Sequence, residues 1–218
     1  MKCPYCGSLV KSGWDACPVC GMPIPSQFNS SNPQKLRLLP RITIPELEKP
    51  ENARWLALLI DTEGAMGWTK RVLKRNRINK KYRHTYTYRT PYIETGMKEI
   101  ESKKIVDRGA YLVGMIAYTY TKNKTKIRYF MVDRGRALVT ISYMKPYLVK
   151  FKRMAILLQT LFRYHTFIPI EKFDHVITML FGKYLRPKQA NKIMLQMPEE
   201  QFNTLIQKAQ KLTLEYLI

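Results

Sequence analysis

The sequence begins with two copies of one five-residue pattern, Cys-Pro-x-Cys-Gly, which together contain every cysteine of the chain. The first copy supplies Cys3 and Cys6, and the second supplies Cys17 and Cys20. In each copy a tight turn brings two thiolates to one metal, and the following glycine allows a left-handed backbone whose N–H groups face the sulfurs. Four thiolates complete a tetrahedral zinc site and leave no position for a reactive water. The pattern therefore predicts a small unit with a structural zinc ion that binds rather than catalyses.

This segment, about residues 1–24, resembles the short double-knuckle zinc ribbons at the ends of many archaeal and bacterial proteins. A unit of this size does not fold without its metal. The alternatives are two disulfides or a redox pair, and the lack of a secretion signal and of thioredoxin-like surroundings disfavours both. Prolines recur through residues 25–50 among Ser and Asn, which predicts a linker that leads into a larger domain near residue 51.

The charge of the chain is large and concentrated. Its 38 basic and 16 acidic residues give a net charge of +22, and residues 51–165 carry 25 basic and 8 acidic side chains, or +17 of that total. Such an excess predicts a polyanionic partner, with nucleic acid as the leading candidate and an ordinary solubilising surface as the alternative. A membrane surface would require a basic amphipathic helix or a lipidation motif, and the longest apolar run, 56–60, is too short to cross a bilayer. We expect a soluble, cytoplasmic protein.

Residues 52–64 predict an amphipathic helix with an acid at its end. Apolar side chains recur at helical spacing from Trp55 to Ile60, Asn52 is a candidate cap, and Gly64 is a natural stop. Glu63 then lies at the negative end of the helix dipole, which opposes a carboxylate. A divalent cation such as Mg²⁺, held by Glu63 and helix-end carbonyls, would offset that repulsion. The alternative is a core helix that ends in an acid and a glycine without further meaning.

Residues 56–64, Leu-Ala-Leu-Leu-Ile-Asp-Thr-Glu-Gly, resemble the signature of the LAGLIDADG homing endonucleases at six of nine positions. In that family two copies of the helix pack side by side, and the eighth-position acid of each binds the metal that cuts one DNA strand. The resemblance implies that Glu63 is the magnesium ligand, with Asp61 beside it in the catalytic set or in a helix-end structural role. Leu58 and Thr62 replace the small residues at which the paired helices approach, which implies a looser pair.

The sequence after this helix predicts two basic hairpins separated by a helix. Alternating aromatic, Thr and β-branched residues indicate strands over 65–73 and 82–93, a helix over 97–107, and strands over 111–121 and 127–133. A two-stranded basic ribbon fits the DNA major groove. The candidate DNA-binding residues are Lys70, Arg71, Lys74, Arg75, Arg77, Lys80, Lys81, Arg83, Arg89, Lys122, Lys124, Lys126 and Arg128.

Helices are expected from residue 136 and again near residue 152, so the order over 51–165 is αββαββα and the fold class is α+β. Residues 166–218 predict two or three further helices, ending in an amphipathic run over 198–218 that we expect to pack against the domain. The αββαββα order is also that of a LAGLIDADG half. The family's assisting basic residue near the end of the fourth strand would correspond to Arg134 or Arg136, and spacing alone does not choose between them.

The leading hypothesis is a site-specific, metal-dependent endonuclease of double-stranded DNA. Because the sequence contains one such helix, two copies must come from two chains, which predicts a homodimer. The second hypothesis is a DNA- or RNA-binding protein on the same scaffold that does not cut, either as a regulator or as an aid to intron splicing. A third is that the zinc ribbon binds a protein partner from the transcription or replication machinery and the rest is a scaffold.

Overall fold

The computed structural model describes residues 42–76 and 83–217, and it describes the side chains of these residues except those of 73–76, 83–85 and 101. The zinc-ribbon prediction and most of the predicted linker lie outside this range. The last part of the predicted linker is a short 3₁₀ helix, η2 (Pro45–Glu48). Ile44 and Leu47 beside it are 2% and 1% exposed in the core, so the folded unit begins before residue 51.

The predicted amphipathic helix is confirmed as α1 (Pro50–Glu63). Pro50 occupies the first helical turn, where its missing N–H has no intrahelical partner to lose. Leu56 and Ile60 lie on the inward face and are fully buried, as the helical spacing requires. The cap prediction is wrong, because Lys49 is the N-cap and the Asn52 side chain instead donates to the Glu46 carbonyl at 2.9 Å.

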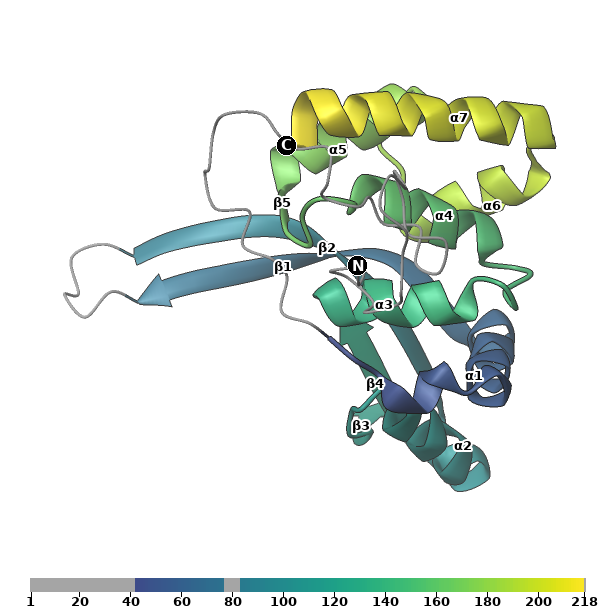
Figure 1. The fold of residues 1–218 in the computed structure, drawn as a ribbon. Coiled ribbons are helices and arrows are strands. Elements are labelled where there is room, and N and C mark those ends of the chain that lie inside the picture. Colours follow the sequence, from purple (N-terminus) through teal and green to yellow (C-terminus); the bar gives the residue numbers. More distant parts are fainter. Residues whose placement is uncertain (1–41, 77–82, 218) are drawn as a thin grey trace.

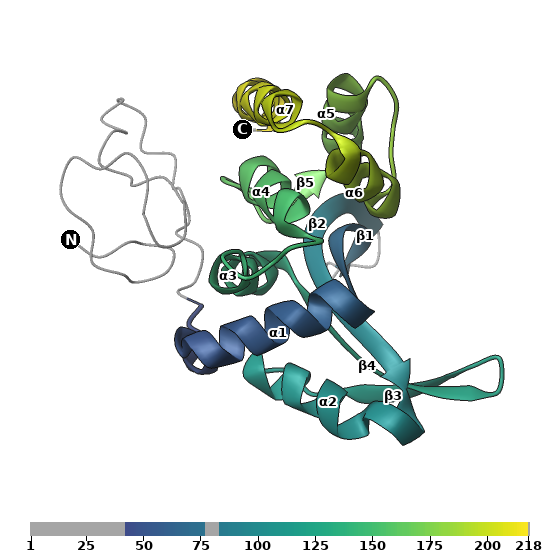
Figure 2. The same ribbon diagram turned by 90° about the vertical axis from the view of Figure 1, so that its right-hand side faces the viewer.

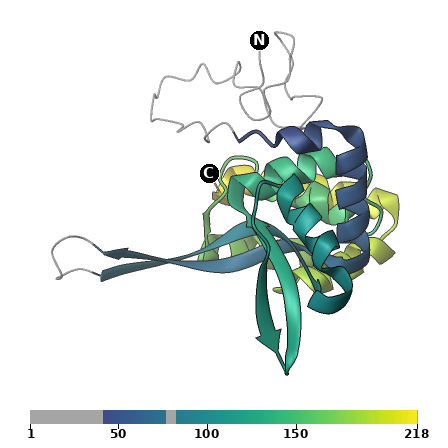
Figure 3. The same cartoon turned by 90° about the horizontal axis from the view of Figure 1, so that it is seen from below.

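An antiparallel sheet with the order β1-β2-β4-β3 carries two hairpins. The first hairpin joins β1 (Gly64–Asn76) to β2 (Arg83–Lys98), and the second joins β3 (Tyr118–Lys122) to β4 (Thr125–Asp133). Figure 3 shows both hairpins projecting from the helical part of the molecule. Asn123 and Lys124 both have positive φ, 48° and 65°, which is the geometry of a tight two-residue hairpin turn. The two-residue strand β5 (Ile168–Pro169) pairs with β2.

The segment between the hairpins is α2 (Glu99–Leu112), which is longer than the predicted helix. The predicted strand over 111–121 is therefore wrong in its first half, since Tyr111 and Leu112 form the last helical turn and pairing begins only at Tyr118. Gly114 ends the helix with φ +65° and donates its N–H to the Tyr111 carbonyl. A left-handed glycine at this place reverses the chain where the aromatic and β-branched composition favoured a strand.

Helices account for the rest of the described chain. After α3 (Arg134–Met144) and α4 (Lys152–Leu161) come α5 (Ile170–Phe181), α6 (Pro187–Gln196), α7 (Glu199–Leu212) and the short π-helix η3 (Thr213–Leu217). Helix α7 packs on α4 and α5 (Figure 1), which confirms the expected packing of the amphipathic run. Buried residues from α1 to η3 belong to one hydrophobic cluster, so the C-terminal helices share the core of the αββαββα unit. The fold class is α+β, as predicted.

Within residues 42–76 and 83–217, no helix is both long enough and apolar enough to span a membrane.

Candidate nucleic-acid interface and metal centre

The two faces of the sheet differ in their covering. Met66, Trp68, Ile93, Phe130 and Val132 alternate onto one face, where they are at most 2% exposed. Helices α1, α2 and α5 pack on this face, and in Figure 2 helices α1, α2 and α3 lie on one side of the sheet. The alternate positions of the same strands form the opposite face, which Pro187 of α6 covers at Gly67 and Phe167 covers at Tyr88. We call the following residues of that face the open face: Thr69, Arg71, Tyr86, Glu94, Lys98, Tyr118, Tyr120, Lys122, Tyr129, Met131 and Asp133.

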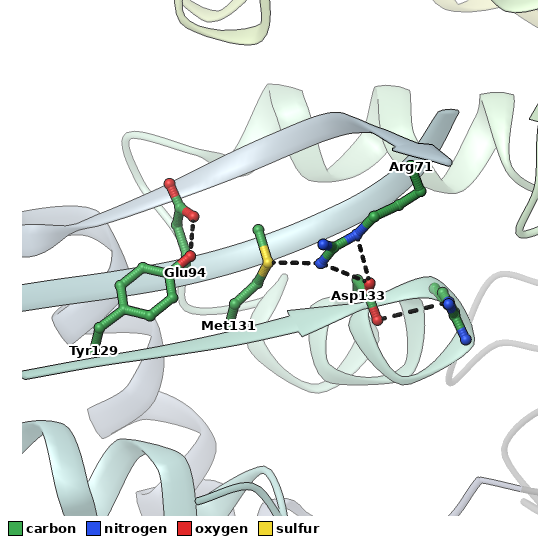
Figure 4. A network of polar contacts seen from close by, with 6 residues as sticks. Arg71, Glu94, Tyr129, Met131 and Asp133 are labelled. Atoms are coloured by element: carbon green, nitrogen blue, oxygen red, sulfur yellow. Dashed lines mark hydrogen bonds and ion pairs between the residues drawn. The ribbon is translucent and has the colours of Figure 1, made fainter. Parts of the chain in front are cut away.

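A polar network crosses the open face between β1, β2 and β4 (Figure 4). The Arg71 guanidinium lies 2.9 Å from the Asp133 carboxylate, and it also contacts the Met131 sulfur at 3.0 Å. On the same face, the Tyr129 hydroxyl donates to the Glu94 carboxylate at 2.5 Å. Burial and the negative charge of Glu94 together raise the pKa of Tyr129, so its hydroxyl remains a donor at physiological pH.

The predicted DNA-binding residues divide into three groups. Lys70, Lys122, Lys124 and Lys126 are exposed, and the three lysines of this group after residue 120 surround the β3–β4 turn. The strand backbone of Lys74, Arg75 and Arg83 is paired in the first hairpin. The side chains of Lys74, Arg75 and Arg83, and all of Arg77, Lys80 and Lys81, lie outside the described residues.

The remaining three arginines of that prediction are engaged by carboxylates. Arg71 pairs with Asp133, as described above, and Arg128 lies 2.7 Å from Asp107 of α2. Arg89 is 13% exposed and makes a two-pronged contact with Asp174 of α5 at 2.9 and 2.8 Å. Burial alone would lower the pKa of Arg89, but the hydrogen bond and charge of Asp174 outweigh it and raise that pKa. Arg89 and Arg128 therefore tie the sheet to helices on its covered face.

Glu63 is the last residue of α1, and its side chain is exposed. Its carbonyl accepts a hydrogen bond from the Thr95 hydroxyl at 3.3 Å, which fixes the helix end against β2. The next residue, Gly64, already belongs to β1. A β-carbon on Gly64 would lie 2.7 Å from the Ile60 α-carbon, so only glycine allows this direct passage from helix to strand. The geometry presents the Glu63 carboxylate to solvent at a fixed point beside the sheet.

Asp61 has a structural environment. Its carboxylate accepts the backbone N–H groups of Val149 at 2.6 Å and Phe151 at 3.0 Å, and so it holds the connection that leads into α4. Each carboxylate oxygen of Asp61 thus already accepts a hydrogen bond from the backbone. It favours the helix-end structural role among the two expected for this residue.

The outward side of α1 carries Arg54, Leu58 and Thr62 at four-residue spacing, and we call these three residues the α1 stripe. Leu58 is 63% exposed, and the Thr62 hydroxyl bonds back to the Leu58 carbonyl at 3.0 Å. Val149, whose N–H donates to Asp61 of α1, is 81% exposed. An apolar side chain is thus presented to solvent at the positions where the family's helices pair.

The two candidate assisting arginines lie in different surroundings. Arg134 follows Asp133 directly, has φ 61°, and stacks its guanidinium 5.1 Å above the Phe167 ring with its side chain 49% exposed. Arg136 donates to the Val113 carbonyl at 2.8 Å, at the turn that ends α2. Arg134 therefore has a guanidinium partly available to an anion, whereas Arg136 holds two segments of the protein together.

Within the described ranges, no group of three or more His, Cys, Asp or Glu side chains is placed to hold a metal ion. Glu63 therefore belongs to no such group among these residues. Mg²⁺ in proteins is often bound by one or two carboxylates together with substrate phosphates and water, so a single acid is a partial site for it. The four cysteines of the predicted zinc site lie outside the described residues.

Several open-face residues were not among the sequence predictions: Glu94, Tyr118, Tyr120, Tyr129 and Asp133. The period of two along β3 and β4 places Tyr118 with Tyr120, and Tyr129 with Asp133, on common faces. That alternation is present in the sequence. It shows which residues share a face, but not which face the helices leave uncovered.

Comparison with known proteins gives two further results. Residues 1–24 match the family model of a zinc-ribbon domain. In structure, the chain is similar to LAGLIDADG homing endonucleases. No curated protein matches its sequence.

Two of these solved structures show the extent of the similarity. The homing endonuclease I-CvuI, bound to the I-CreI target with Mg and with its DNA not cleaved, is 12% identical with a TM-score of 0.40. The similarity covers 75% of this chain and 97% of the I-CvuI chain. The LAGLIDADG homing endonuclease I-LtrWI, bound to its target DNA, is 14% identical with a TM-score of 0.39, over 74% of this chain and 58% of that one.

Proposed function

We propose that this protein is a site-specific endonuclease of double-stranded DNA that acts as a homodimer and uses a divalent metal at Glu63. The observation that carries the proposal is the exposed carboxylate at the end of α1, held by Gly64 and Thr95 beside the sheet that carries the open face. A surface acid at the negative end of a helix is electrostatically unfavourable, and a bound cation offsets this cost. The resemblance of residues 56–64 to the LAGLIDADG signature supports the same assignment.

The open face and the two projecting hairpins are the proposed DNA-binding surface. Lys98 and Lys122 lie on that face, Lys124 and Lys126 flank the β3–β4 turn, and Lys70 is exposed on the first hairpin. Contacts from these lysines to phosphates would position the duplex, and side chains of the open face would meet base edges in the major groove. We assign Arg89 and Arg128 to holding the sheet on its helices rather than to DNA.

Within this proposal Glu63 would hold Mg²⁺. A divalent cation in such a site lowers the pKa of a bound water and neutralises charge that develops on the phosphate. Arg134 is the better candidate for the assisting cation, because its guanidinium is half exposed beside Asp133 and stays protonated throughout. It would stabilise negative charge on the phosphate and could not act as a base.

The proposed dimer forms through the α1 stripe. Each chain offers one Glu63 at the end of one α1 helix, and two strands of DNA require two such acids. The exposed Leu58 gives the stripe an apolar centre that a second copy would cover. At the other end of the chain, Cys3, Cys6, Cys17 and Cys20 would hold a structural Zn²⁺ in the ribbon, which is also the proposed site for a protein partner.

The deciding experiment compares the wild type with Glu63→Gln on supercoiled plasmid DNA in the presence of Mg²⁺. Glutamine keeps the shape and removes the charge, so nicking should be lost while DNA affinity stays nearly unchanged. Glu51→Gln is the matched control, since Glu51 is an exposed acid in the first turn of the same helix. Unchanged nicking by Glu63→Gln would reject the assignment of the metal site.

The alternative is a protein that binds DNA or RNA on this scaffold without cutting. Leu58 at the motif's glycine position favours it, because a dimer that packs on this larger side chain would hold the two Glu63 carboxylates further apart than a glycine would. If the wild type and Glu63→Gln bind DNA equally and neither cuts a plasmid that contains the bound sequence, the non-cutting function replaces the nuclease.

A further inference from the structure

Glu94 is an acid near the middle of the surface that we propose for DNA, and the inference below rests on that proposed function. In the strand register Glu94 of β2 lies between Ala65 of β1 and Met131 of β4, so its direct neighbours carry no charge. Among the residues that the structure describes, Glu94 has no ion-pair partner. Asp133 differs, because Arg71 and Arg134 lie within 2.9 and 3.9 Å of its carboxylate.

Tyrosines surround Glu94 instead of cations. The Tyr129 hydroxyl donates to it at 2.5 Å, and Figure 4 shows the two side chains meeting between β2 and β4. Burial, and then the charge of Glu94, raises the pKa of Tyr92 to about 12. Burial is likewise the main cause of the raised pKa of Tyr118, and the charge of Glu94 adds to it. The negative charge of Glu94 therefore acts on three neighbouring phenols.

The ring of Tyr129 is held in place from one side. Tyr118 and Tyr120 of β3 contact it edge-on, with ring centroids 5.0 and 5.8 Å away. Because the Tyr129 proton is directed at Glu94, its oxygen can only accept hydrogen bonds, and the Tyr118 hydroxyl is already hydrogen-bonded to it. The Glu94 carboxylate has about four lone-pair positions, of which Tyr129 occupies one. The pair is thus a fixed cluster of acceptors on the open face, whose other charged residues are Arg71, Lys98, Lys122 and Asp133.

An acceptor cluster discriminates between base edges in the major groove. Cytosine presents only an amino donor there, whereas adenine presents its amino donor beside the N7 acceptor, and guanine presents two acceptors. A carboxylate is repelled by N7 and by the phosphates, so its favourable partner on a duplex is the cytosine amino group. We infer that Glu94 is a specificity-determining residue that accepts a hydrogen bond from a cytosine N4 amino group, with Tyr129 as its positioning residue.

Glu94→Gln is a sharp test because it changes the hydrogen-bonding pattern and keeps the shape. A glutamine amide offers one donor and one acceptor, which match N7 and the N6 amino group of adenine. The full-length wild type and the variant are each used to select sequences from a library of random duplex DNA, without Mg²⁺. We expect one position of the selected sequence to change from cytosine to adenine, with about a tenfold change in the ratio of the two bases.

Tyr129→Phe is the second variant, and Glu48→Gln is the control, since Glu48 is an exposed acid on η2. Tyr129→Phe should weaken the cytosine preference without creating one for adenine, and the control should select the wild-type sequence. If Glu94→Gln selects the wild-type base at every position, the inference is overturned while the proposed function stands.

A wild type that enriches no sequence overturns both the inference and the proposed function. Loss of the native thermal transition in both Glu94→Gln and Tyr129→Phe would give the pair a structural role only, and would also overturn the inference.

Discussion

Leu58→Ala should weaken dimerisation of the protein without weakening the fold of its monomer. Leu58 is 63% exposed on the α1 stripe, so most of its side chain contributes nothing to the monomer core. Complete burial of a leucine side chain is worth about 2 kcal/mol, of which about 1.3 kcal/mol remains to be gained when a second copy covers it. Two copies of the contact then contribute about 2.5 kcal/mol per dimer, which corresponds to about 60-fold in the dissociation constant. Alanine keeps the β-carbon, so this figure is an upper value.

Sedimentation equilibrium over a range of protein concentrations measures this constant directly. The control is Ile100→Ala, because Ile100 is 97% exposed on α2, away from the α1 stripe, and should leave the constant unchanged. The free energy of unfolding of the monomer should change by less than about 0.5 kcal/mol in both variants, as is usual for exposed positions. The reasoning is refuted if the wild type stays monomeric at all concentrations, or if the two variants weaken the dimer equally.

Three further measurements test the roles assigned above. Asp61→Ala removes the acceptor of two backbone N–H groups and should lower the free energy of unfolding in urea by about 1–3 kcal/mol. Glu63→Ala should not lower it. Equal stability of the two variants would contradict the structural role of Asp61. Chelation should remove about one Zn²⁺ per chain and leave the thermal transition of the main domain in place. Cys17→Ser should likewise lose the zinc and keep that transition. A ribbon that stays ordered without metal would reject the zinc assignment. Because the pKa of Tyr92 is raised to about 12 in the folded chain, its contribution to stability should be complete below about pH 10, the unfolded value, and decline from there toward pH 12. Tyr92→Phe should make urea stability less dependent on pH in that range, and an unchanged dependence would argue against the shift.

The sequence contains enough local information to predict most elements of this fold, and the failures have physical causes. The helix 52–64 and the four strands follow from hydrophobic periods of 3.6 and 2 residues, which depend only on neighbours in the chain. The segment 111–117 has strand-like composition, but Leu112 is buried at the end of α2 and a left-handed Gly114 turns the chain before the strand begins at Tyr118. The conformation of that segment depends on tertiary packing, and the local sequence alone does not contain this information.

The roles of charged residues were harder to predict than the elements that carry them. Arg89 was expected to bind DNA because it lies in an acid-free basic stretch, yet its partner Asp174 is 85 residues later in the chain. The partner that fixes Asp61 is the backbone near Val149, 88 residues away. Charge density along the sequence identifies a basic surface, but only the fold determines which cations are already neutralised. Glu63 needs no distant partner, and its position at the end of α1 agrees with the helix end expected from the sequence.

The passage from α1 to β1 without a connecting residue has a mechanical consequence. A loop between two elements absorbs rotation of one against the other, and here Gly64 belongs to the strand while Glu63 still belongs to the helix. The Thr95 hydroxyl also ties the Glu63 carbonyl at the helix end to β2. A tilt of α1 therefore moves the first hairpin with it, and the displacement is largest at the tip of the hairpin. In a two-fold pair of such chains, the angle between the two helices would fix how far apart the two hairpins stand along a duplex, and insertion of a base pair between two half-sites could be accommodated only by bending the DNA.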